Sequence, residues 1–118
     1  AAPHARYRKA MAAIEADPNQ FLAIMEEAGE IIGCLQLTYI PGLSRLGAWR
    51  GQIESVRIAS AYRGRGLGRR FIAWAIGQCR DRGCSLVQLT TDKTRPEALR
   101  FYNRLGFVAS HEGMKLNL

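Results

Sequence analysis

Arg63-Gly64-Arg65-Gly66-Leu67-Gly68 is a basic, glycine-rich segment that separates two regular patterns. It follows an apolar-alternating run at residues 53–58 and precedes a run with helical periodicity at residues 67–79. This order predicts a strand, a turn and a helix, an arrangement that binds phosphate through backbone N–H groups and the helix dipole. The glycines permit positive φ and the close approach of a ligand. The segment therefore predicts a site for a phosphorylated cofactor.

Regular patterns on both sides of this segment predict an α/β fold with a mixed sheet. One strand alternates in polarity, and its two-residue period predicts one face shared by Gln52, Glu54, Val56 and Ile58. Helices are predicted over residues 4–16, 67–79 and 94–105, a loop over residues 41–48, and strands over residues 21–25, 31–40, 49–58, 86–91, 107–110 and 114–118.

Three sequence signals mark the ends of the two later helices. Gly83 is placed to cap the helix at residues 67–79. Thr94-x-x-Glu97 resembles a capping box at the start of the last helix, and Gly106 ends that helix.

Composition limits the class of protein. The 118 residues, 47% of them apolar, suit one domain over residues 1–118. No run reaches the ~20 apolar residues of a membrane span, and no signal peptide is visible. The odd set of Cys34, Cys79 and Cys84 argues against a disulfide framework and against a metal site, so a cytoplasmic location fits best. The net charge of +7 favours an anionic ligand, an acidic partner or a solvated basic surface, while the scattered arginines disfavour nucleic acid.

Two familiar phosphate-binding patterns fail at residues 63–68. The P-loop needs Lys and then Ser or Thr after its last glycine, where this chain has Arg69 and Arg70. The dinucleotide fingerprint needs Gly-x-Gly-x-x-Gly, but the spacing here is Gly64-x-Gly66-x-Gly68. It also needs an acidic residue that ends a strand about 20 residues later, which this chain lacks.

A third pattern fits. Arg63-x-x-Gly66-x-Gly68 resembles the pyrophosphate loop of the GNAT N-acetyltransferase superfamily, Arg/Gln-x-x-Gly-x-Gly/Ala. A second segment, Ala98-Leu99-Arg100-Phe101-Tyr102-Asn103-Arg104-Leu105-Gly106-Phe107, resembles the Ala-x-x-Phe-Tyr-x-x-x-Gly-Phe segment of the same family. The resemblance covers residues 20–118 and implies a GNAT-like, mostly antiparallel central sheet flanked by helices.

The resemblance implies a site for acetyl-CoA and no metal. Backbone N–H groups of the glycine-rich segment would hold the pyrophosphate, with help from arginines that could otherwise be solvated surface residues. The strand before it would pair with the pantetheine amides in a V-shaped slot that opens toward residues 86–91. The implied cofactor-binding residues are Arg57, Ile58, Arg63, Gly64, Arg65, Gly66, Leu67, Gly68 and Arg69.

Two side chains are candidates for proton transfer. Tyr102 matches the family residue that protonates the departing CoA thiolate, although a core tyrosine would show the same pattern. Glu54 lies on the predicted strand face among apolar neighbours, where a carboxylate tends to have a raised pKa that suits a general base. Gln52 fills the other strand position at which family members carry this group, and a salt bridge to an arginine is the alternative role for Glu54.

These features predict an acetyl-CoA-dependent N-acetyltransferase that acts on a primary amine, in a small molecule or a peptide, within a ternary complex. The acceptor slot is expected to involve two loops, the one after the first helix and the one at residues 41–48, and neither selects an acceptor. A GNAT-fold acyl-CoA sensor without catalysis is the alternative, and amine-dependent release of CoA separates the two. A basic nucleic-acid-binding protein ranks last.

Two features depart from the family pattern. A strand and a helix usually precede the helix at residues 4–16, and both are missing from this sequence. The exposed sheet edge would then be covered by another chain, as in a homodimer, or the chain is a shortened form. Arg95 stands where the family often has an Asn that contacts the cofactor.

Overall fold

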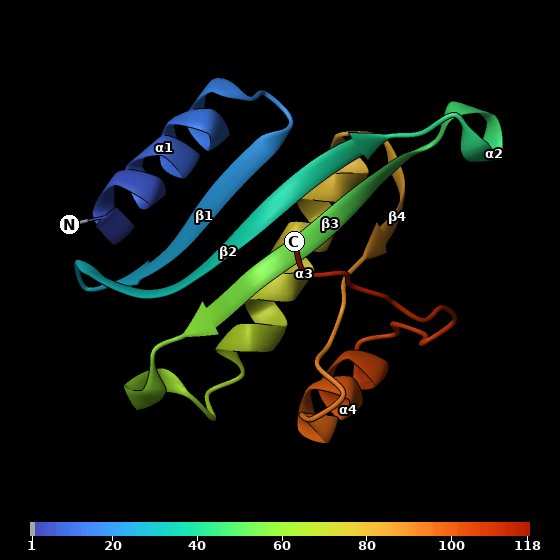
Figure 1. The fold of residues 1–118 in the computed structure, drawn as a ribbon. Coiled ribbons are helices and arrows are strands. Elements are labelled where there is room, and N and C mark those ends of the chain that lie inside the picture. Colours follow the sequence, from blue (N-terminus) through green and yellow to red (C-terminus); the bar gives the residue numbers. More distant parts are fainter. Residues whose placement is uncertain (1) are drawn as a thin grey trace.

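The structure, a computed structural model, describes residues 2–118 and has the predicted order of elements as far as the last helix (Figure 1). These elements are α1 (Ala2–Ala16), β1 (Gln20–Glu27), β2 (Glu30–Pro41), α2 (Ser44–Gly47), β3 (Trp49–Ile58), a 3₁₀ turn (Ser60–Tyr62), α3 (Leu67–Asp81), β4 (Cys84–Gln88) and α4 (Pro96–Arg104).

The four strands form one mixed sheet in the order β1-β2-β3-β4. The first two pairs are antiparallel, and β3 pairs with β4 in parallel through the crossover helix α3. The predicted mixed, mostly antiparallel sheet is thus confirmed. Within the described residues α1 is the first element, and β1 forms one edge of the sheet beside it (Figure 1).

Helix α3 covers one face of this sheet, and the hydrophobic core lies between them. In Figure 1 the helix runs behind β2 and β3. Burying each large side chain in this layer contributes about 1.5–3 kcal/mol. The core residues are Phe71, Ile72, Ala75 and Cys79 of α3 with Ala23, Leu35, Leu37, Tyr39 and Ile53 of the strands.

Strands β3 and β4 part after a short ladder. Their pairing begins at Trp49 and Cys84 and ends at Gln52 and Gln88. Strand β3 continues to Ile58, whereas β4 stops at Gln88 and not at residue 91 as predicted. The two strands therefore diverge beyond Gln52 and Gln88 and leave an opening between them.

A bulge at Ser55 changes which residues of β3 share a face. Ser55 has φ of 55°, and the register between β2 and β3 shifts opposite it. Because the bulge adds one residue, Val56 and Ile58 pack against the core while Glu54 is exposed beside Gln52. The predicted single face for these four residues is therefore wrong.

The start of α4 also differs from the prediction. Its N-cap residue is Arg95, which makes no side-chain capping hydrogen bond. Thr94 instead donates from its hydroxyl to Asp92 Oδ1 at 2.7 Å and from its backbone N–H to the same atom at 2.9 Å. Because Asp92 engages Thr94 in this local turn, the capping box does not form.

The two predicted C-terminal strands, residues 107–110 and 114–118, are irregular in the structure. Strand-forming side chains need a neighbouring strand to pack and pair with, and none of the described strands pairs with these segments. Val108, Met114 and Leu116 are consequently exposed. None of the described helices is long and apolar enough to cross a membrane.

Candidate active site

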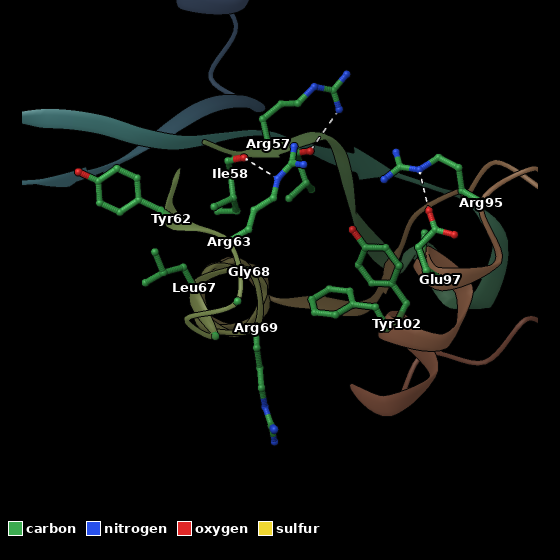
Figure 2. Close-up of a pocket in the computed structure, with 15 residues that line it drawn as sticks. Arg57, Ile58, Tyr62, Arg63, Leu67, Gly68, Arg69, Arg95, Glu97 and Tyr102 are labelled. Atoms are coloured by element: carbon green, nitrogen blue, oxygen red, sulfur yellow. Dashed lines mark hydrogen bonds and ion pairs between the residues drawn. The ribbon is translucent and has the colours of Figure 1, made fainter. Parts of the chain in front are cut away.

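A cavity of about 570 Å³ lies between the end of β3, the start of α3 and α4. Figure 2 shows its lining residues, which come from these three elements, from the glycine-rich segment between β3 and α3, and from Tyr62 and Arg95 next to them. All of the predicted cofactor-binding residues except Arg65 line this cavity. The fold therefore brings together residues that the sequence spreads over β3, the segment and α3.

The glycine-rich segment presents backbone to this cavity. Gly64 and Gly66 have φ of 80° and 73°, and a Cβ added to either would meet no atom within 4 Å. The first hydrogen bond of α3 joins Arg70 N–H to Gly66 O, which leaves the N–H groups of residues 67–69 without helical partners. Open space beside unpaired N–H groups at a helix N-terminus fits a pyrophosphate.

The three arginines of this region point in different directions. Arg63 lines the cavity and donates from Nε to Ile58 O at 3.4 Å. The side chain of Arg69 extends away from the other lining residues (Figure 2). Arg65 is held outside the lining, because it donates two hydrogen bonds to Glu27, at 2.8 and 3.0 Å.

The Arg65–Glu27 ion pair joins the glycine-rich segment to the β1–β2 hairpin. The hydrogen bonds from Arg65 lower the pKa of Glu27, and the Arg65 guanidinium lies 5.3 Å from the centre of the Tyr62 ring. Tyr62 in turn donates to Glu30 Oε2 at 2.8 Å on the same hairpin. The partners lie 32 and 38 residues apart in sequence, so local patterns carry no sign of this attachment.

Tyr102 lies on α4 with its hydroxyl directed toward β3 (Figure 2). Its ring contacts Phe101 and Phe107 at centroid distances of 5.0 and 5.6 Å. Burial raises the pKa of the Tyr102 hydroxyl above its ordinary value. A neutral hydroxyl at the cavity wall is able to donate a proton.

Glu54 lies in a second cavity, of about 480 Å³, that meets the first. The two cavities meet where β3 and β4 part, and they share the lining residues Val56, Arg57, Arg95, Ala98 and Tyr102. Gln88 Nε2 donates to Gln52 Oε1 at 2.8 Å, and Gln52 Nε2 donates to Glu54 Oε1 at 2.7 Å. The carboxylate is thus held by an amide relay across the two strands, and not by the arginine considered from sequence.

Some residues at this site differ from expectation. The loop at residues 41–48 lies at the Trp49 end of β3 and contributes no residue to either cavity, so it does not line the opening. Arg95 lines both cavities and contacts Glu97 Oε1 at 3.4 Å. Sequence reasoning missed Gln88 and Lys115, because only the register of β4 and the path of the C-terminal segment bring them to the site.

No group of three or more His, Cys, Asp or Glu side chains within residues 2–118 is arranged to hold a metal ion. The site instead offers backbone N–H groups, arginines and a tyrosine as hydrogen-bond donors, and carboxylates as acceptors.

The sequence is similar to those of characterised acetyltransferases. The chain is 32% identical over 105 residues to an aminoalkylphosphonate N-acetyltransferase from Salmonella typhimurium, covering 89% of this chain and 68% of that protein. It is 36% identical over 93 residues to a glucosamine 6-phosphate N-acetyltransferase from Trypanosoma brucei brucei, covering 79% of this chain and 61% of that protein. The chain thus spans about two thirds of the length of these relatives.

A solved structure is also closely similar. A protein from Bacillus halodurans described as a transcriptional regulator superimposes with a TM-score of 0.93 at 49% identity, covering 97% of this chain and 76% of that one. Residues 1–107 match the model of the acetyltransferase (GNAT) family. The chain therefore belongs to the acetyltransferase (GNAT) family.

Proposed function

We propose that this protein transfers the acetyl group of acetyl-CoA to the primary amine of a small molecule, by direct attack within a ternary complex. One observation carries the proposal: two cavities join at the point where β3 and β4 separate. One cavity adjoins the glycine-rich segment, the other contains Glu54, and both reach Tyr102. The two curated relatives described above are named for small amines, which supports a small acceptor.

In this proposal the first cavity binds acetyl-CoA. The unpaired N–H groups of residues 67–69 and the open backbone at Gly64 and Gly66 receive the pyrophosphate. Arg63 is the arginine best placed to add charge, because Arg65 is paired with Glu27 and Arg69 extends away. The part of β3 beyond Gln52 has no β4 partner. In this proposal an extended ligand pairs along that edge, where Val56 O and Ile58 O accept hydrogen bonds from the side chains of Arg57 and Arg63 in the free protein.

Acetyl-CoA supplies an acetyl group activated as a thioester. In the proposed reaction a bond forms between the amine nitrogen and the acetyl carbon, and the bond from that carbon to sulfur breaks. Glu54 accepts the proton that the amine loses, and the Tyr102 hydroxyl donates a proton to the departing thiolate. Because the two reactants lie in joined cavities, their proximity and orientation also lower the activation barrier.

Two measurements test this function in sequence. Titration calorimetry should detect saturable binding of acetyl-CoA, and a thiol assay with pooled primary amines should detect amine-dependent release of CoA. Absence of acetyl-CoA binding would refute the proposal. Binding without release by any amine would identify a sensor, the alternative raised by the sequence.

A further inference from the structure

Some of the charged side chains around the second cavity have partners within the described residues, and others do not. Its charged lining residues are the carboxylates Glu54 and Asp92 and the cations Arg57, Arg95 and Lys115. Asp92 accepts two hydrogen bonds from Thr94, and Arg95 contacts Glu97. Among residues 2–118, neither Arg57 nor Lys115 forms an ion pair. The cavity therefore contains two positive charges, on Arg57 and Lys115, that no carboxylate of the described residues pairs with.

Lys115 reaches this cavity from an otherwise exposed C-terminal segment. A Cβ added to Gly113 would lie 3.6 Å from Thr90 Cγ2, so this part of the segment lies beside the chain that follows β4. Lys115 and Asp92 line the same cavity. Hydrogen bonds from Thr94 lower the pKa of Asp92, and the positive charge of Lys115 adds to that effect. No hydrogen bond within the described residues explains a lysine at this position.

Arg57 supplies the second free cation, on β3 and near Glu54. It pairs in register with Cys34, on the sheet face opposite α3, where Glu54 pairs with Gln36. Its Nη1 donates only to its neighbour Val56 O, at 3.2 Å. A guanidinium without a carboxylate partner is well suited to a carboxylate or phosphoryl oxygen of a ligand.

We propose that the acceptor is a small primary amine that also carries an anionic group, with the amine at Glu54 and the anion between Arg57 and Lys115. This inference rests on the proposed function, because it assigns the second cavity to the acceptor. A carboxylate, a phosphate or a phosphonate would satisfy the same two cations. The net charge of +7 would also attract such an acceptor over long range.

Matched amines test this substrate class. The probes are 2-aminoethanol, which is neutral apart from its amine, β-alanine, phosphoethanolamine and 2-aminoethylphosphonate. At least one anionic probe should exceed 2-aminoethanol by about tenfold in kcat/KM, equivalent to about 1.4 kcal/mol. The three anionic arms separate carboxylate from phosphoryl recognition. Equal or better use of 2-aminoethanol would overturn the inference.

The variant Lys115→Met tests the assigned residue. We expect KM for the preferred anionic amine to rise about tenfold, clearly more than KM for 2-aminoethanol, with the dissociation constant of acetyl-CoA unchanged. Lys93→Met is the matched control, because Lys93 is an exposed lysine outside both cavities, and it should change none of these values. Equal effects of the two variants would reject the role of Lys115.

A binding measurement tests the anion site independently of catalysis. Calorimetry with each amine on the CoA-saturated protein should give tighter binding of an anionic probe than of 2-aminoethanol. If that preference is present but no amine releases CoA, the proposed catalysis fails and the anion site stands. If amines release CoA without any preference for the anionic probes, catalysis stands and the anion site fails.

Discussion

Arg65 of the glycine-rich segment and Glu27 of β1 form a two-point ion pair, with hydrogen bonds of 2.8 and 3.0 Å. The pair lies outside the lining of the first cavity, although Arg65 sits between two glycines that line it. Its role in the structure is therefore to hold the segment against the β1–β2 hairpin. A segment held in place presents its N–H groups to a ligand without first having to be ordered.

The variant Glu27→Gln should weaken acetyl-CoA binding by a few-fold, measured by calorimetry, because the segment loses its attachment. Its effect on stability should be small, because solvent screens an exposed ion pair. If the variant instead binds acetyl-CoA more tightly, then Glu27 competes with phosphate for Arg65, and the attachment role is wrong.

Gly66→Val should abolish acetyl-CoA binding. Gly66 has φ of 73° as the N-cap of α3, a conformation that a β-branched residue adopts only with strain, and the added side chain would enter the cavity. Gly77→Ala is a matched control, because Gly77 lies within α3, has ordinary backbone angles and has no atom within 4 Å of an added Cβ.

The control should bind acetyl-CoA normally and gain about 0.5–1 kcal/mol in free energy of unfolding. Retention of binding by Gly66→Val, at unchanged thermal stability, would contradict the role of the segment.

The elements near this segment were predictable because their signals are local. The bounds of β3 match those predicted, and the helix after the glycines begins at the predicted Leu67. Both follow from periodicity that neighbouring residues carry. The bulge at Ser55 was not predictable, because a serine with positive φ leaves no mark in the sequence.

The chemistry of the site was predictable only in part, because only some of its residues belong to local sequence patterns. The family motifs directed attention to Tyr102 and to the glycines, but the amide relay from Gln88 and the cation at Lys115 depend on register and on long-range approach. The predicted C-terminal strands failed because strand propensity without a partner strand does not decide conformation.

Tyr102→Phe should lower kcat by about 100-fold if the hydroxyl is the proton donor, within the range for general acid catalysis. The ring contacts with Phe101 and Phe107 remain, so the dissociation constant of acetyl-CoA should stay the same. Burial raises the pKa of Tyr102, so the hydroxyl keeps its proton at neutral pH. In the wild type, kcat should therefore not fall on account of Tyr102 until the pH exceeds about 10, the ordinary value for tyrosine.

An unchanged kcat in Tyr102→Phe, measured under acetyl-CoA saturation, would assign the residue to the core alone. A fall in kcat near pH 8 that disappears in the variant would also contradict the raised pKa.

Glu54→Gln should lower kcat by about 100-fold or more, because an amide does not accept the amine proton. Glu54→Asp should retain more activity than Glu54→Gln, since it keeps a carboxylate on the same strand. Gln52→Leu removes the hydrogen bond to Glu54 and should reduce kcat by a smaller factor without changing acetyl-CoA affinity. Equal kcat in wild type and Glu54→Gln would show that another group, or water alone, takes the proton.

Gly51 and Cys79 are in such close contact that the sheet and α3 tolerate no larger side chain between them. A Cβ added to Gly51 would overlap Cys79 Sγ and would also lie 3.3 Å from Cys79 Cβ. Both residues are buried, and burial raises the pKa of the Cys79 thiol to about 11, so the thiol stays neutral. Gly51→Ala should therefore lower the free energy of unfolding by about 1–3 kcal/mol, as overpacking does.

A double-mutant cycle with Cys79→Ala tests this contact directly, by urea denaturation followed by circular dichroism. Replacing the sulfur with hydrogen makes room for the new methyl group, so the double variant should be more stable than the sum of the two single changes predicts. Additive losses would mean that the backbone moves to relieve the overlap. Because β3 carries Gly51 at one end and the catalytic candidate Glu54 three residues later, such a movement would also appear as a loss of kcat in Gly51→Ala.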